Sequence, residues 1–276
     1  MTAAYRTLFQ SELLAIDEHS CRACRSDWSR ELGGEPASIL FVRRGCFGVR
    51  GRIEVVADPF SALIYDGDPG YRLRRPVDGG DAITRITPSA ALMQEALGKT
   101  PIHVPVTPSI HLRHLRLYAQ AGAANADRLD VEEAAVELLH AVAGLTGVPD
   151  EPRPGPARRR VAEARAFLAA SPELDHRLSD VARAAGCSPF HLARIFREET
   201  GASVRAYRLR LRLAAAVDQL AEGAHDLTTL AMDTGFSHHS HMTSAFQKVL
   251  GASPSAVRES LGRSSTFLKA RLRPAA

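Results

Sequence analysis

The sequence predicts an α+β protein of two domains, an antiparallel β-structure followed by an all-α domain. Three observations lead to this class. Short apolar runs alternate with turn residues early in the chain, one helical pattern occurs twice near its end, and four prolines interrupt the sequence between these parts. The length of 276 residues is sufficient for two domains that each bury a core. We place the domains at 1–148 and 158–262, joined by a linker at 149–157.

Six short apolar runs between residues 38 and 86 predict strands. Each run is four to six residues long, and clusters of Gly, Asp and Pro separate it from the next. Closely spaced strands with such turn residues between them indicate an antiparallel barrel or sandwich. In chain order the runs are SILFV, CFGV, RIEVVA, ALIY, YRLR and AITRI.

Three helices are predicted in the segment 88–146. Two Thr-Pro dipeptides mark helix starts, because threonine can cap a helix and proline fits its first position. These starts are Thr87-Pro88 and Thr107-Pro108, with helices expected at 88–97 and 108–121.

The third helix, 130–146, has the clearest periodicity. Asp130 and Glu133 are spaced as in a capping box, and an apolar stripe continues over four turns. The stripe can cover the β-structure or pair two subunits, and the sequence leaves both possibilities open. It consists of Val131, Ala134, Ala135, Leu138, Leu139, Val142 and Leu145.

Basic charge is concentrated after the Pro-rich linker, which we expect to be stiff and extended. Residues 157–276 hold 18 Lys and Arg against 11 Asp and Glu, a net charge of +7, whereas residues 1–156 hold 17 against 20, a net charge of −3. The densest basic run, Arg158 to Arg160, directly follows the linker. A basic domain of this kind predicts nucleic-acid contact, and the alternative is a module that uses its basic surface to bind protein or ligand.

One pattern occurs twice in the C-terminal domain. LSDVARAAGCSPFHLARIFREETGAS, from Leu178 to Ser203, is followed by LTTLAMDTGFSHHSHMTSAFQKVLGAS, from Leu227 to Ser253. Matched positions recur 49 residues later in the first half of the pattern and 50 residues later in the second half, which indicates an internal duplication with one inserted residue.

Each copy predicts a helix, a tight turn and a second helix. Gly186 fits the left-handed conformation that ends a helix, and Ser188 and Pro189 fit the start of the next one. Ser237 is the expected cap in the second copy. The units at 178–200 and 227–250 therefore have the layout of helix-turn-helix motifs, whose second helix enters the major groove of DNA. An ordinary helical hairpin packed for stability is the alternative reading of a single copy.

These residues resemble the C-terminal domain of the AraC/XylS family of bacterial transcription regulators. The resemblance covers about 100 residues, Val161 to Ser260, with the strings HLARIFREETGAS, LRLAAA and LAMDTGFSHHSHMTSAFQKVLGASPSAVR. It implies seven helices, with both recognition helices on one face of the duplex. Ser244 stands where the family usually has Arg, Val257 where it has Tyr, and Val204 where it has Pro.

The resemblance also implies an N-terminal, cupin-like β-barrel that senses an effector. A regulator of this class is expected in the cytoplasm, with promoter DNA, RNA polymerase, a small-molecule effector and a second copy of the chain as its partners. The N-terminal sequence shows no signal peptide, and no apolar stretch is long enough to span a membrane.

The candidate DNA-contacting residues lie on three helices. The first recognition helix offers Phe190, His191, Arg194 and Arg197, and the second offers His239, Ser240, His241, Ser244 and Lys248. The connecting helix, 203–220, carries Arg205, Arg208 and Arg212 at helical spacing, either for phosphate contact or as a solvated face. For an effector, strand alternation suggests Phe41, Phe47 and Tyr65, which can equally belong to the core.

No enzyme, metal or cofactor is predicted. Cupin oxygenases need several histidine ligands, and His19 is the only histidine among the first 100 residues. The sequence contains no GxSxG motif and no Gly-rich phosphate loop. His19, Cys21 and Cys24 have the spacing of half a zinc site, but only Cys46 remains to complete it in this domain.

Overall fold

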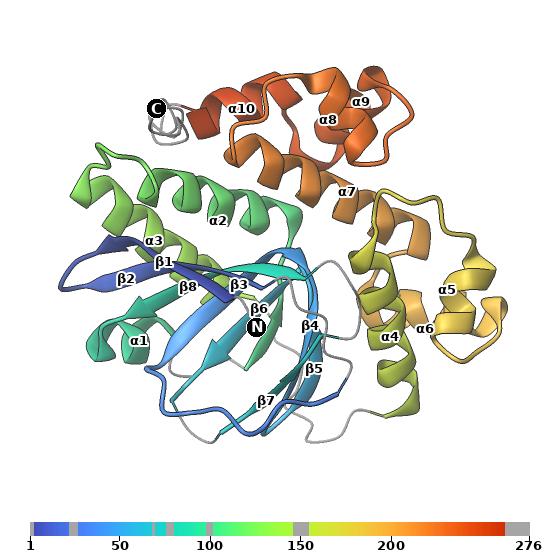
Figure 1. Cartoon of the computed structure of the whole chain (residues 1–276), viewed down its shortest axis with the longest axis horizontal. Helices are drawn as coiled ribbons and strands as arrows, with labels where there is room; N and C mark the ends of the chain where they lie inside the picture. The colour runs from blue at the N-terminus through green and yellow to red at the C-terminus, as the bar shows by residue number, and fades with distance from the viewer. Residues whose placement is uncertain are drawn as a thin grey trace, which may run out of the picture.

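The computed structural model describes residues 3–21, 27–67, 70–75, 80–97, 102–145 and 155–262. The strands and three helices form an N-terminal half, and the helices after residue 155 form a helical half packed beside it (Figure 1). The predicted linker at 149–157 lies largely outside the described residues, and its last two residues already belong to a helix.

The described strands form two antiparallel sheets. The six-stranded sheet has the order β1-β2-β8-β3-β6-β9, and the three-stranded sheet has the order β5-β4-β7. All six predicted strands are confirmed, and β1, β2 and β9 were not predicted. The strands are β1 (Ala3–Gln10), β2 (Leu14–Cys21), β3 (Ser38–Gly45), β4 (Phe47–Arg50), β5 (Glu54–Ala57), β6 (Ser61–Tyr65), β7 (Arg72–Arg74), β8 (Asp81–Pro88) and β9 (His103–Pro105).

The closed barrel that the resemblance implied is not formed by these strands. Within the described residues β1 and β9 are the edges of the large sheet, and no ladder joins that sheet to the small one. The N-terminal half is therefore sheet-rich and open at its strand edges.

The helices of the N-terminal half cover the large sheet. They are α1 (Ala90–Leu97), α2 (Pro108–Ala121) and α3 (Arg128–Ala143). Thr107 caps α2 as predicted, by accepting a hydrogen bond from the backbone N–H of Ile110. Two predicted starts are wrong: Pro88 ends β8, and α3 is capped by Asp127 instead of beginning at Asp130.

The apolar stripe of α3 packs against the chain's own sheet. Leu138 and Leu139 are buried in a core that also contains Ile16, Ile39 and Ile86 of the large sheet. The structure thus supports the sheet-covering alternative, because a stripe buried within one chain is not free to pair subunits.

The helical half contains seven helices among the described residues, the number that the resemblance implied. They are α4 (Pro156–Ala170), α5 (Leu178–Ala184), α6 (Pro189–Thr200), α7 (Val204–Ala221), α8 (Leu227–Asp233), α9 (His239–Leu250) and α10 (Pro254–Gly262). The long helix α7 connects the two helix-turn-helix units (Figure 1).

Each unit shares its core with the N-terminal half. The core of α4 to α7 includes Cys46, Val56 and Phe60 from the sheet half. The core of α7 to α10 includes Leu115 and Tyr118 from α2. The N-terminal half also has a core of its own around the large sheet, so the two halves are packed against each other through these shared residues.

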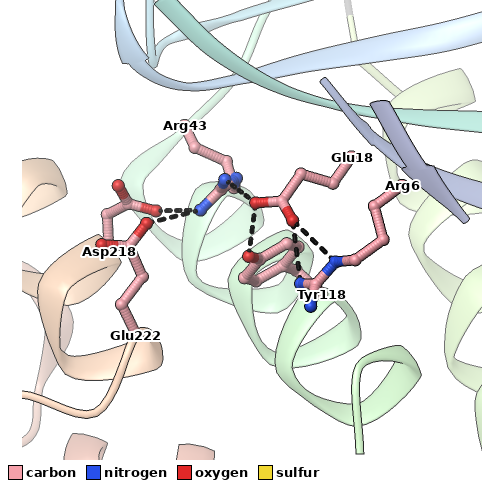
Figure 2. Close-up of polar contacts among 6 residues, drawn as sticks. All are labelled: Arg6, Glu18, Arg43, Tyr118, Asp218 and Glu222. Atoms are coloured by element: carbon pink, nitrogen blue, oxygen red, sulfur yellow. Dashed lines mark hydrogen bonds and ion pairs between the residues drawn. The ribbon is translucent and has the colours of Figure 1, made fainter. Parts of the chain in front are cut away.

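Buried ion pairs also join the halves. Arg43 of β3 is 1% exposed, and its guanidinium donates to Asp218 of α7 at 2.8 Å and to Glu18 of β2 at 2.5 Å (Figure 2). The same guanidinium lies 4.0 Å above the ring of Tyr118. A single buried cation thus contacts a strand, the helix over the sheet and the helix between the two units.

A second buried ion pair lies at the other end of α7. Asp58, which follows β5, accepts hydrogen bonds from Arg165 of α4 at 2.9 Å and from the hydroxyl of Tyr207 at 2.5 Å. Burial alone would raise the pKa of Asp58, but Arg165 and these hydrogen bonds hold it below its ordinary value. Asp58 is therefore a buried carboxylate that links α4 and α7 to the sheet half.

Candidate nucleic-acid interface

The turn of the first unit has the predicted geometry. Gly186 has φ 63°, and the Ser188 hydroxyl accepts from the backbone N–H of His191 at 3.3 Å. Pro189 takes the first helical position, and Gly201, with φ 67°, ends α6. These caps fix both ends of the recognition helix.

The outer face of α6 is open to solvent. Phe190 is 84% exposed, and Arg194 and Arg197 are exposed as well. Arg194 pairs with Glu198 at 3.1 Å, but both side chains are more than half exposed, so this pair is readily exchanged for a phosphate or a base. His191 is half-buried, and its Nε2 lies 3.1 Å from Nη1 of Arg160.

The second unit differs from the prediction at its cap. The residue that caps α9 is His238, whose Nδ1 accepts from the backbone N–H of His241 at 3.1 Å. Ser237 is displaced to a contact with the His241 ring at 3.2 Å. The inserted residue of the second copy therefore shifts the cap by one position.

All five candidate residues of α9 are exposed. Histidine and serine dominate this face, and it has no arginine to form the paired hydrogen bonds that read guanine. The two recognition helices thus present similar shapes with different chemistry. The exposed residues are His239, Ser240, His241, Ser244 and Lys248.

The three arginines of α7 do not share one free face. Arg205 is exposed and has no partner among the described side chains. Arg212 is buried, and its guanidinium donates to three backbone carbonyls, so its proposed phosphate contact is wrong. Arg208 is half-buried and pairs with Asp175 at 2.8 Å, which makes it a poor phosphate ligand.

A cavity of about 230 Å³ lies between the two sheets. Phe47 and Tyr65 line it as predicted, together with Tyr71. Phe41 does not: it is buried in the core of the large sheet and stacks on His114 with ring centroids 4.7 Å apart. Alternation identified which residues share a face of a strand, but it could not tell which face borders a cavity.

The cavity wall is mainly apolar, and its charged groups are paired. Arg85 lies 3.4 Å from Glu35, and Arg75 pairs with Asp81. Burial and the hydrogen bond to Glu35, 2.5 Å from its hydroxyl, raise the pKa of Tyr71, so this phenol stays protonated. Such a wall suits a small, mostly neutral molecule. These charged residues could not be recognised from the sequence, because they come from separate segments of the chain.

A second cavity, of about 280 Å³, lies where the halves meet, between β5 and the helices α4, α6 and α7. Val56, Phe60, Arg165 and Tyr207 are among its lining residues. The two cavities adjoin at β5, because Val55 lines both of them.

The described residues contain no cluster of ligands that could hold a metal ion. Of the sequence-predicted half site, Cys24 lies outside the described residues and Cys21 is buried. Burial raises the pKa of Cys46 to about 12, so this thiol stays protonated. None of the described helices is long and apolar enough to cross a membrane.

Comparisons with known proteins agree with the helical half. Residues 181–260 match a family described as a helix-turn-helix domain. The HTH-type transcriptional regulator GlxA of Rhizobium meliloti is 34% identical over 82 residues, which cover 30% of this chain and 25% of that protein. A putative AraC-like transcription regulator of Streptomyces lividans is 30% identical over 177 residues, which cover 63% of this chain and 53% of that protein.

Among solved structures, a transcriptional regulator of Chromobacterium violaceum with an AraC-type DNA-binding domain is 25% identical. The match covers 38% of this chain and 93% of that one, with a TM-score of 0.37. The chain spans between 25% and 53% of the length of the curated relatives that it matches. Residues 181–260 therefore form a helix-turn-helix domain, as the sequence motifs predicted, and its AraC-like relatives are regulators.

Proposed function

We propose that this chain is a sequence-specific DNA-binding transcription regulator of the AraC type. The observation that carries the proposal is the pair of capped recognition helices, α6 and α9, whose polar faces remain open to solvent in a body that is otherwise closely packed. The net charge of +7 after residue 156 supplies attraction to phosphates. No catalytic step is part of this function.

The proposal includes a small-molecule effector that binds between the two sheets. The cavity there is slightly below the usual range of about 300–1,000 Å³ for ligand pockets, so the effector is small. Its apolar wall and paired charges favour a molecule with little net charge. Its binding can reach the helical half through β5, since Val55 lines both cavities and Asp58 follows the strand.

RNA polymerase and a second copy of the chain complete the proposed partners, and the cytoplasm is the proposed location. A dimer must use a surface other than the apolar stripe of α3, because that stripe is buried within the chain.

Selection from a library of random DNA duplexes tests the proposal. We expect the full chain to enrich one bipartite sequence, with an affinity that falls steeply with salt because bound counterions are released. If no DNA sequence is enriched and DNA binding does not depend on salt, the result would instead support the alternative of a protein- or ligand-binding module. Genome-wide footprinting would then identify the regulated promoters.

A further inference from the structure

The loop of residues 171–176 joins α4 to α5 and directly precedes the first helix-turn-helix unit. Arg212 of α7 binds it through three backbone carbonyls. Its Nε donates to Pro172 at 2.7 Å, and its Nη2 donates to Glu173 at 3.1 Å and to Leu174 at 3.0 Å. A planar guanidinium can satisfy several acceptors in one fixed geometry, so the loop is held firmly on α7.

The turn of the second unit packs against the same loop. Gly235 ends the α8 side of that turn with φ 82°, a conformation that favours glycine. A Cβ placed on Gly235 would lie 2.6 Å from Cα of Glu173 and closer still to its carbonyl oxygen. The turn of the second unit therefore touches the backbone of the loop before the first unit, at a point where only glycine fits.

The first unit provides an internal comparison. Gly186 occupies the matching position of its turn and also has a positive φ, of 63°. A Cβ at Gly186 would meet nothing within 4 Å. The close approach is thus a property of the contact with the loop 171–176 and not of the helix-turn-helix turn itself.

We propose that Arg212 and Gly235 are positioning residues that fix the separation and relative orientation of α6 and α9. The inference rests on the proposed function, because it concerns how two recognition helices read one operator. Recognition helices that enter successive major grooves must lie about 34 Å apart along the duplex. The contact sets this relationship because the turn at Gly235 leads into α9, while the loop at Glu173 leads into α5 of the unit that carries α6.

Three single variants of the full chain test the inference: Gly235→Ala, Arg212→Met and, as the matched control, Gly186→Ala. The control also places Ala at positive φ but leaves the contact intact. For each we would measure the affinity for the selected bipartite operator and for each isolated half-site. Joint binding in a fixed geometry makes the second contact intramolecular, so the whole operator should bind far more tightly than either half.

We expect Gly235→Ala and Arg212→Met to keep the wild-type affinity for each half-site. The ratio of whole-operator affinity to half-site affinity should fall on the order of tenfold in both variants. Gly186→Ala should keep the wild-type ratio. An equal ratio in all three variants would overturn the inference, as would a wild-type chain that binds the whole operator no better than a half-site. Arg212→Met places no additional atom at the close backbone contact. It therefore tests the inference even if Gly235→Ala does not fold.

A distance measurement that needs no DNA separates this inference from the proposed function. Spin labels attached through an unnatural amino acid at positions 198 and 248, which match in the two copies, report the separation of α6 and α9. We expect one narrow distribution in the wild type and in Gly186→Ala, and a shifted or broader one in Gly235→Ala and Arg212→Met. Identical distance distributions in the wild type and all variants would reject the positioning role. If the distributions shift as expected but the chain does not bind DNA, only the proposed function is rejected.

Discussion

Arg43 of β3 and Asp218 of α7 lie 2.8 Å apart, although 175 residues separate them in the sequence. Both side chains are 1% exposed, so water contributes little to the solvation of either charge. Each half of the molecule supplies one member of the pair. Removal of Arg43 therefore leaves the buried carboxylate of Asp218 without its counterion at the junction of the halves.

We expect Arg43→Ala to lower the free energy of unfolding by about 3–5 kcal/mol, the usual effect of breaking a buried ion pair. Urea unfolding would measure it. Arg194→Ala is the control, since its pair with Glu198 is more than half exposed and should contribute about 0–1 kcal/mol. An Arg43→Ala chain as stable as the control would show that the buried pair does not hold the halves together.

Stability should fall as the pH drops below about 6.5, because three histidines are buried in the neutral form. Burial lowers the pKa of His103 to about 3 and of His111 to about 4, and it lowers the pKa of His114 well below 6.5. Below pH 6.5 the unfolded chain binds protons at these rings and the folded chain does not. Each ring then costs about 1.4 kcal/mol of stability per pH unit, down to its folded pKa.

The variant His114→Phe isolates one of these rings. Neither nitrogen of His114 has a partner within the described part of the chain, and phenylalanine can keep the stacking on Phe41. Urea unfolding between pH 7 and 5 should show a slope smaller by about one proton in the variant. An unchanged slope would mean that His114 is protonated in the folded chain.

The two recognition helices should contribute unequally to sequence discrimination. Arg194 can form two hydrogen bonds to guanine, worth about 1–3 kcal/mol, whereas Ser244 at the matching position forms one less selective bond. Arg194→Ala should relax specificity in one half of the operator, Ser244→Ala should do much less, and Ser244→Arg should alter base preference in the other half. Competition against a randomised operator library measures all three. Equal losses in the two alanine variants would contradict the asymmetry.

Arg205 should contact phosphate, and Arg212 should not. Arg205 is exposed without a partner among the described side chains, so Arg205→Ala should weaken binding about equally on all sequences and reduce the salt slope by about one. Arg212→Met should leave the salt slope for a half-site unchanged, because its guanidinium faces backbone carbonyls. Titrations at several salt concentrations compare the two variants. A reduced slope in Arg212→Met would restore the phosphate role.

Local patterns predicted most of the helical half and the strands between 38 and 86, because caps, turn glycines and periodicity act over a few residues. The strands β1 and β2 were missed since their facing side chains are polar and pair with one another, as in the contact of Thr7 with Asp17 at 2.9 Å. The short β9 is three residues long and ends in proline, which gives no strand signal.

The long-range features could not be predicted. Arg208 and Arg212 share a helix face with Arg205 in the sequence pattern, but the loop 171–176 covers Arg208 and Arg212. Which face of a helix is solvated depends on neighbours that periodicity does not reveal. The same reason explains why Phe41 proved to be core while Phe47 and Tyr65 line the cavity.

The shared cores limit how this chain can be recombined with its relatives. A chimera cut at the linker would join a foreign sensor half to helices whose apolar faces fit Cys46, Val56 and Phe60 on one side and α2 on the other. It would also leave Asp218 and Arg165 facing surfaces without their counterions. The unit that can be exchanged as a working part is therefore larger than the helix-turn-helix domain and includes the matching patch of the sheet half. Designs that transplant only residues 158–262 should first supply that patch.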